Sequence, residues 1–268
     1  MHLGGRMIED KAITRTVNVA LLGNPNSGKT TLFNHLTGLR QKVGNFPGVT
    51  VEKKIGRFNL DQLEIQIIDF PGTYSAYPTS QDERIVIDML CNPEDRNYPE
   101  AVVYVADTTN LEKHLLFFTQ LRDLKLPMLL VLSMSDIAMQ DGLEIDIPQL
   151  QKQLGVPIVA INGRKGNEVN LLKEQLQHLL LDKPHFSDKS FYQITNSEKK
   201  IIESIKAVIP TRSDYHALLL AHHGHWLPHL SDEQKERIST INKENEFVDL
   251  KQQIHETMQR YNRFEPIV

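Results

Sequence analysis

The chain has 268 residues, of which 40% are hydrophobic and 24% charged, as expected for a soluble globular protein of one large or two smaller domains. Its 30 Lys and Arg residues against 34 Asp and Glu give a net charge of −4, which argues against nucleic acid or an anionic membrane surface as a partner. The single cysteine, Cys91, excludes an intramolecular disulfide and fits a reducing cytoplasmic compartment. The uncharged stretch 215–230 is too short, and too rich in histidine, for a membrane-spanning helix.

Residues 1–15 are expected to be a tag or a disordered N-terminus, because they lack the order of a signal peptide and MHLGGR precedes a second methionine, Met7. From residue 16 to 182, short β-branched or leucine-rich runs alternate with stretches of helical period, which is typical of a mostly parallel sheet covered by helices. Six strands are predicted, at 17–22, 54–60, 63–69, 101–107, 127–133 and 157–161. Only Asp61 and Gln62 separate the second strand from the third, so these two are expected to form an antiparallel hairpin at one edge.

Residues 183–268 are predicted to form a small all-helical domain, because strand signals stop and prolines separate polar helical segments. Thr195 to Glu198 has the pattern of a capping box ahead of a helix. Apolar residues at spacings of three and four predict a long amphipathic helix close to the C-terminus, at Phe247, Leu250, Ile254, Met258 and Tyr261.

The first strand leads into GNPNSGKT, Gly23 to Thr30, which fits the phosphate-binding pattern G-x-x-x-x-G-K-[ST] between a strand and a helix. Backbone N–H groups of such a loop wrap phosphates, Lys29 is expected to reach the β- and γ-phosphates, and the Thr30 hydroxyl to ligate Mg²⁺. The expected nucleotide contacts are Gly23, Asn24, Asn26, Ser27, Gly28, Lys29, Thr30 and Thr31.

A second marker, DFPG at 69–72, closes the third predicted strand. Asp69 is expected to help hold Mg²⁺, and the Gly72 N–H to sense a γ-phosphate. The loop 41–54 between the two motifs contains one threonine, Thr50, whose hydroxyl is expected to complete the Mg²⁺ shell when a γ-phosphate is present. Thr73 stands where small GTPases place a water-orienting glutamine, so we expect slow intrinsic hydrolysis.

The fifth strand ends in SMSD, 133–136, where a guanine-reading protein would carry Asn-Lys-x-Asp. Asp136 keeps a carboxylate that can accept hydrogen bonds from guanine N1–H and the N2 amino group. Ser133 is expected to be too short to bridge the base and the phosphate-binding loop, as an asparagine would. Met134 is expected to pack on the face of the base. A last base-contacting loop is expected at 160–167, with Asn162 and Gly163 in place of the usual Ser-Ala.

The motifs GNPNSGKTTLFN, GNFPGVTVEKK, DFPGTYS and SMSD together resemble the N-terminal cytosolic G domain of the ferrous-iron transporter B family (FeoB). The resemblance implies a P-loop, Ras-like G domain at 16–182, followed by a helical domain that joins it to a membrane permease in the same polypeptide. It also implies that GTP binding and hydrolysis gate or drive Fe²⁺ uptake at the cytoplasmic face of a bacterial inner membrane. On the same resemblance Asn26 would hold a stimulating K⁺, while self-association stays open.

Three functions remain open from the sequence. The chain hydrolyses GTP with Mg²⁺, or it senses guanine nucleotide with incidental turnover, or it is an ATP-using P-loop protein. The missing glutamine after Gly72 favours sensing, and the altered SMSD permits ATP, whereas Asp136 opposes ATP.

Overall fold

The computed structural model describes residues 15–161, 168–182 and 190–267. The strands are β1 (Arg15–Gly23), β2 (Gln41–Asn45), β3 (Glu52–Leu60), β4 (Leu63–Asp69), β5 (Ala101–Asp107), β6 (Met128–Ser133) and β7 (Ile158–Ala160). The helices before residue 183 are α1 (Lys29–Thr37), α2 (Gln81–Cys91), α3 (Leu111–Asp123), α4 (Ser135–Gln140), α5 (Ile147–Leu154) and α6 (Val169–Asp182), with a 3₁₀ turn η1 (Thr108–Asn110). The helices after it are α7 (Asn196–Lys206), α8 (Asp214–His223), α9 (Asp232–Glu244) and α10 (Asp249–Phe264), followed by η2 (Glu265–Ile267).

The strands form one sheet in the order β2-β3-β4-β1-β5-β6-β7. β1 pairs in parallel with β4 and β5, and β6 in parallel with β5 and β7, whereas β3 is antiparallel to both β2 and β4. The mostly parallel α/β sheet is therefore confirmed. The carboxyl ends of β1, β4, β5 and β6 meet at one edge, which is where parallel sheets bind ligands.

The predicted number of six strands is wrong, because β2 adds a seventh within the segment that we expected to be a loop. All five β2 residues are exposed, so the strand has no hydrophobic alternation to reveal it. Backbone pairing with β3, from Gln41 opposite Gly56 to Asn45 opposite Glu52, forms it instead. The β3–β4 hairpin is confirmed, but β2 rather than the hairpin lies at the sheet edge.

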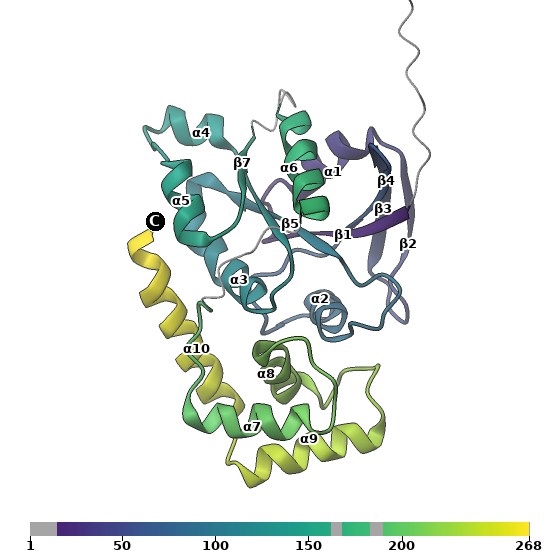
Figure 1. Cartoon of the computed structure of the whole chain (residues 1–268), viewed down its shortest axis with the longest axis vertical. Coiled ribbons are helices and arrows are strands. Elements are labelled where there is room, and N and C mark those ends of the chain that lie inside the picture. The colour runs from purple at the N-terminus through teal and green to yellow at the C-terminus, as the bar shows by residue number, and fades with distance from the viewer. Residues whose placement is uncertain (1–14, 162–167, 183–189, 268) are drawn as a thin grey trace, which may run out of the picture.

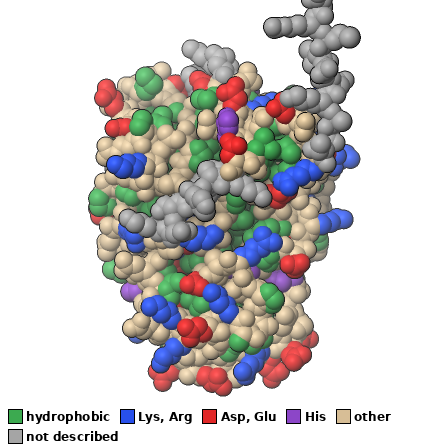
Figure 2. Space-filling model, viewed as in Figure 1, with side chains coloured by type: hydrophobic (Ala, Val, Ile, Leu, Met, Phe, Trp, Pro, Cys, Tyr) green, Lys and Arg blue, Asp and Glu red, His purple; other side chains and the backbone are tan. Residues whose placement is uncertain are grey.

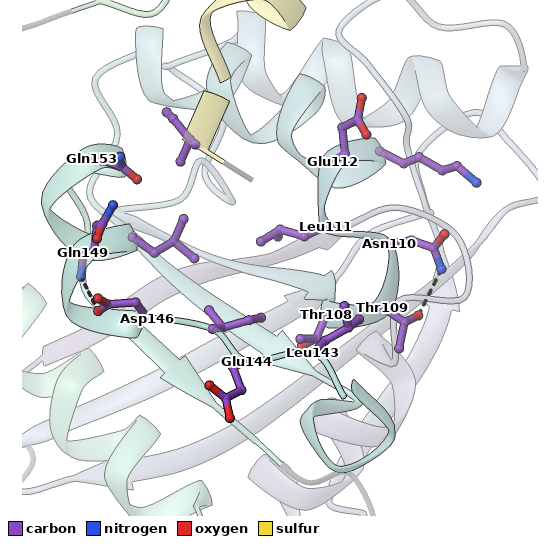
Figure 3. Close-up of a pocket in the computed structure, with 14 residues that line it drawn as sticks. Thr108, Thr109, Asn110, Leu111, Glu112, Leu143, Glu144, Asp146, Gln149 and Gln153 are labelled. Carbon is purple, nitrogen blue, oxygen red and sulfur yellow. Dashed lines mark hydrogen bonds between the residues drawn. The ribbon is translucent and has the colours of Figure 1, made fainter. Parts of the chain in front are cut away.

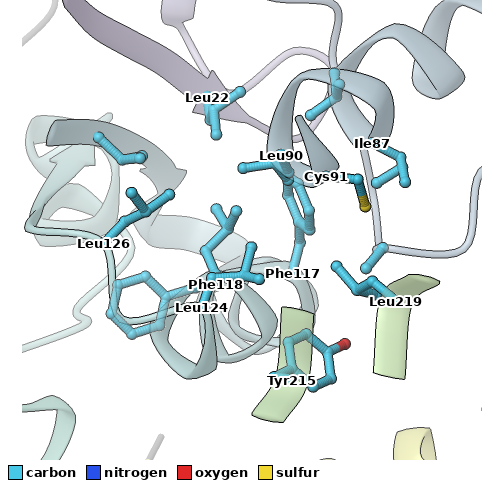
Figure 4. Close-up of a cluster of buried hydrophobic side chains, with 14 of the residues drawn as sticks. Leu22, Ile87, Leu90, Cys91, Phe117, Phe118, Leu124, Leu126, Tyr215 and Leu219 are labelled. Atoms are coloured by element: carbon cyan, nitrogen blue, oxygen red, sulfur yellow. The ribbon is translucent and has the colours of Figure 1, made fainter. Parts of the chain in front are cut away.

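Helices cover both faces of the sheet (Figure 1). One hydrophobic cluster packs α1 and α6 on the first face. On the second face a larger cluster joins the sheet to α2 and α3 and continues without a break into α7, α8 and α9. Figure 4 shows the junction, where Phe117 and Phe118 of α3 and Cys91 of α2 approach Tyr215 and Leu219 of α8. Helices α7 to α10, called the helical unit below, thus share a core with the sheet.

All four long helices described after residue 190 match the predicted helical character of this part of the chain, while its division into a separate domain stays a prediction. The capping box at Thr195 and Glu198 is present at the start of α7. The C-terminal helix is confirmed as α10, but its apolar stripe faces solvent at Leu250, Ile254 and Met258.

No helix within the described part of the chain is long and apolar enough to cross a membrane. On the face shown in Figure 2, acidic and basic side chains are interspersed over the surface. This mixed surface agrees with the small net charge of −4.

Candidate nucleotide site

The GNPNSGKT loop connects the carboxyl end of β1 to the start of α1, as the sequence predicted. Both of its glycines are required by geometry. A Cβ on Gly23 would lie 2.3 Å from the carbonyl oxygen of Val105 in β5, and Gly28 has a φ of +88°, which favours glycine. The loop therefore curves tightly over the sheet edge, and its backbone is free to approach a ligand closely.

Lys29 begins α1, and its side chain lies back along the loop rather than in solvent. Its ammonium donates to the carbonyl oxygens of Gly23 and Asn24, at 3.3 and 3.2 Å. Burial lowers the pKa of Lys29, and the negative charge of Asp69 partly opposes this effect. The Lys29 ammonium is thus held against the loop, where it could contact the phosphate oxygens of a bound nucleotide.

Asp69 ends β4, directly beside β1, and the chain then crosses beneath the loop. The Phe70 N–H donates to the Leu21 carbonyl, and a Cβ on Gly72 would lie 2.7 Å from the Pro25 nitrogen. Burial raises the pKa of Asp69, while the charge of Lys29 lowers it in part. Within the described residues, the buried Oδ1 of Asp69 has no hydrogen-bond partner. A desolvated, unpartnered carboxylate oxygen of this kind is suited to a cation.

Five of the predicted phosphate and metal residues share one cleft of about 850 Å³, whereas Asn26, the predicted K⁺ ligand, is not among the residues that line it. Lys29, Thr30, Thr50, Asp69 and Gly72 all line it. The oxygen donors of Thr30, Thr50 and Asp69 are the hard ligands that Mg²⁺ prefers. The arrangement fits a magnesium ion coordinated together with phosphates.

The two asparagines of the loop have different environments. Asn24 is buried, accepts a hydrogen bond from the Tyr104 hydroxyl at 3.0 Å and donates to the Lys113 carbonyl at 3.1 Å. Its side chain is therefore committed to the protein. Asn26 is exposed and has a φ of 61°, a left-handed conformation that asparagine tolerates better than most residues. Of the two, only Asn26 presents its side chain to solvent.

Three further predicted residues lie at or beside the loop. Ser27 is buried, and Thr30 and Thr31 are exposed on the first turn of α1. The Ser27 hydroxyl has no partner within the described residues.

Ser133 is joined to the phosphate-binding loop, while the expectation that serine is too short to bridge loop and base stays a prediction. Its hydroxyl lies 2.7 Å from the Ser27 carbonyl oxygen and 3.1 Å from that of Ala106. The reach suffices because Gly28 brings the loop close, so that a Cβ on Gly28 would lie only 3.4 Å from the Ser133 Cβ. The strand end is further held by Thr108, whose hydroxyl donates to the Ser133 carbonyl at 2.5 Å.

The rest of SMSD turns into a short helix. Met134 has a φ of 57° and precedes α4, which places Asp136 in the first turn, partly exposed. The Ser135 hydroxyl donates to the Ile161 carbonyl at 2.9 Å and so ties this turn to the end of β7. Asn162 and Gly163 lie outside the described residues.

The segment after Gly72 is bonded to the helical unit, a connection that the sequence analysis missed. Ala76 is the centre of this contact, because its N–H donates to the Gln120 side chain at 2.7 Å and its carbonyl lies 2.8 Å from His223 Nε2. Tyr77 extends the contact through its hydroxyl, which donates to Glu256 of α10 at 2.5 Å. Only long-range pairing could reveal this, since Tyr77 and Glu256 are 179 residues apart.

Glu256 is the centre of a buried polar hub. Besides Tyr77, it accepts hydrogen bonds from the Tyr215 hydroxyl at 2.7 Å and from Arg260 Nε at 2.7 Å. Burial opposes its ionisation, but the charge of Arg260 and these hydrogen bonds outweigh burial and lower the pKa of Glu256. Arg260 also pairs with Asp123 of α3 at 2.8 Å. The hub therefore ties α3, α8 and α10 to the segment that follows the phosphate site.

A second cavity, of about 460 Å³, contains none of the predicted site residues. It lies between the start of α3 and α5, with Leu111, Asp146 and Gln149 around it (Figure 3). It therefore lies outside the candidate site.

A family model described as ferrous iron transport protein B matches residues 17–176. This chain belongs to that family. A curated relative, the Fe(2+) transporter FeoB of Leptospira biflexa, is 37% identical over 218 residues, which is 80% of this chain and 31% of the relative. The Escherichia coli K12 FeoB is 39% identical over 163 residues, 59% of this chain and 21% of that protein. The chain thus spans less than a third of the length of these FeoB relatives.

Solved structures of FeoB proteins share the fold. The GDP-bound mutant of the S. thermophilus FeoB G-domain is 33% identical, has a TM-score of 0.75 and covers 94% of this chain and 97% of that one. The cytosolic domain of L. pneumophila FeoB is 30% identical with a TM-score of 0.75, covering 92% of this chain and 98% of that one. The fold is therefore the α/β P-loop fold of the FeoB G domain.

Proposed function

We propose that this chain binds GTP and GDP with Mg²⁺, hydrolyses GTP slowly, and couples nucleotide state to a membrane Fe²⁺ transporter. The observation that carries the proposal is the single cleft shared by Lys29, Thr30, Thr50 and Asp69. Family membership and the GDP-bound state of a similar G domain support guanine nucleotide as the ligand.

In this mechanism the loop from Gly23 to Gly28 wraps the phosphates, and Lys29 exchanges its bonds to loop carbonyls for bonds to phosphate oxygens. Mg²⁺, when bound, would supply charge neutralisation to the phosphates. Thr30, Thr50 and Asp69 would hold it. Thr50 is exposed, so its contact depends on the γ-phosphate and can report its presence.

Hydrolysis is proposed to be slow. Thr73 is fully buried, and its hydroxyl donates to the Pro71 carbonyl at 3.1 Å. The residue after Gly72 therefore offers no side chain to orient a water molecule. We propose that K⁺ partly compensates, held by the exposed Asn26 against the phosphates in the electrostatic role that an arginine finger has elsewhere.

The proposed output runs through the helical unit. The segment after Gly72 is bonded to α8 through His223 and to α10 through Glu256, so a shift of that segment would be transmitted to both helices. Because the FeoB relatives are more than three times as long as the matched part, we propose a membrane permease domain in the parent polypeptide as the receiver. The chain would then act at the cytoplasmic face of a bacterial inner membrane.

The sensing function remains the second candidate, since the inward hydroxyl of Thr73 favours it. Single-turnover hydrolysis separates the two candidates. With enzyme in excess over GTP and Mg²⁺ present, we expect GDP to form at roughly 10⁻⁴ to 10⁻² s⁻¹, the range of intrinsic GTPases. The Asp69→Asn variant is the control for contaminating activity. Bound GTP that persists in the wild type as long as in this variant would favour sensing over hydrolysis.

A further inference from the structure

The base-reading motif of this chain offers the ligand no side-chain hydrogen-bond donor. Ser133 has one hydroxyl hydrogen, and the two nearest oxygens, the carbonyls of Ser27 and Ala106, can only accept it. Ser135 likewise donates its hydrogen to the Ile161 carbonyl. Met134 has no donor in its side chain, and Asp136 is an acceptor when ionised. Across residues 133–136, the side chains can therefore accept hydrogen bonds from a base but cannot donate them.

Guanine presents donors and acceptors on different edges. N1–H and the N2 amino group donate, whereas N7 and O6 accept. The Asp136 carboxylate complements the donor edge. An asparagine at position 133 would carry two N–H groups, enough to bond both the loop and the N7 acceptor, but the single hydrogen of Ser133 is already used on the loop.

We infer that Ser133 gives no hydrogen bond to N7 of the purine, so that residues 133–136 select guanine only through its donor edge, by Asp136. The inference rests on the proposed guanine-nucleotide function and deepens it. Asp136 then selects the purine, and Ser133 leaves its N7 without a hydrogen bond. Guanine nucleotides altered at N7 belong to the ligands of this site.

The test compares GDP with 7-deaza-GDP, in which a C–H group replaces N7, by calorimetric titration in Mg²⁺ buffer. For the wild type we expect the two dissociation constants to agree within about twofold, because no neutral hydrogen bond is lost. IDP lacks the N2 amino group, from which Asp136 would accept a hydrogen bond, and should therefore bind about tenfold more weakly than GDP. This second comparison shows that the titration can detect the loss of one base contact.

Two variants at the same position sharpen the test. Ser133→Asn adds a donor, so 7-deaza-GDP should bind about tenfold more weakly than GDP to this variant. Ser133→Ala removes the loop contact and should weaken both ligands equally.

If the wild type binds 7-deaza-GDP about tenfold more weakly than GDP and Ser133→Ala loses this difference, the inference is overturned and the proposed function stands. The same difference in both proteins would place the N7 donor outside position 133, in support of the inference. If the wild type does not bind GDP at all, the proposed function fails, and the inference with it. Equal binding by the wild type supports the inference even if Ser133→Asn does not fold.

Discussion

At the scale of single residues, we propose that Asp136 selects the base. It lies in the first turn of α4, one helical turn from the strand end that contacts the phosphate loop. An asparagine there would present an N–H group to the position of the guanine N2 amino group, and would suit the oxygen that xanthine carries instead. We therefore predict that Asp136→Asn lowers GDP affinity by on the order of a hundredfold and makes XDP the preferred ligand, as measured by calorimetry. Unchanged preference for GDP would exclude Asp136 as the base reader.

Asn26 supports a prediction on cation dependence. Its φ of 61° suits glycine, so Asn26→Gly removes the side chain without straining the loop. If the Asn26 oxygen holds K⁺, the wild type should hydrolyse GTP at least about tenfold faster in K⁺ than in Na⁺, and the variant should lose this difference. Single-turnover rates in matched KCl and NaCl buffers measure it. A K⁺ response that survives in Asn26→Gly would place the cation elsewhere.

The residues that sequence could predict here are those of a short contiguous pattern. Lys29 and Thr30 follow from spacing alone, because strand, loop and helix are adjacent in the chain. The contact from Ser133 to Ser27 could not be predicted, since it depends on how closely Gly28 approaches β6. Residue type at position 133 predicts the loss of the bridge to the base, which stays a prediction, but it does not reveal the loop contact that backbone proximity allows.

At the scale of elements, the polar hub links α10 to the segment after Gly72. Glu256→Gln would leave Arg260 with a single buried carboxylate partner, Asp123. Removing one member of a buried ion pair commonly costs about 3 kcal/mol or more, so we predict a loss of that size in the free energy of unfolding. Urea denaturation measures the loss. The exposed Glu244→Gln change is the matched control and should shift stability by less than about 0.5 kcal/mol.

A Glu256→Gln variant as stable as this control would show that the hub does not hold α10.

The same helix shows what periodicity can and cannot predict. Its spacing predicted a helix, but the side chains that it buries most deeply are Glu256, Arg260 and Phe264. The two polar residues, Glu256 and Arg260, are buried because they find partners on α8 and α3, which no local pattern records. In the same way, β2 forms by backbone pairing with β3, and its exposed side chains give no signal.

At the scale of the whole molecule, two buried histidines join α8 to the other part of the fold. His223 contacts the Ala76 carbonyl and His216 the Cys91 carbonyl. Burial is the main cause that lowers the pKa of His223 to about 3 and that of His216 to about 4, from an ordinary value of 6.5. Between pH 6.5 and about 4, the unfolded chain therefore binds protons at these positions that the folded chain does not bind.

Stability should accordingly fall as pH is lowered through this window, by about 1.4 kcal/mol per pH unit for each histidine at most. Glutamine at position 223 keeps a donor for the Ala76 carbonyl but does not titrate. We predict that His223→Gln lowers the slope of the unfolding free energy against pH by up to the contribution of one proton. Urea denaturation from pH 7 to 4.5 measures this slope. An unchanged slope would show that His223 is not kept neutral by the fold.

We propose that the cleft and SMSD together form a guanine-nucleotide site. The measurement that tests it most directly is calorimetric titration of the purified chain with GDP and with ADP in Mg²⁺ buffer. Adenine lacks the N1–H and N2 amino donors from which Asp136 would accept hydrogen bonds. GDP should therefore bind on the order of a hundredfold more tightly than ADP. Equal or tighter binding of ADP would contradict the claim, since SMSD would then be a strand end without a role in reading the base.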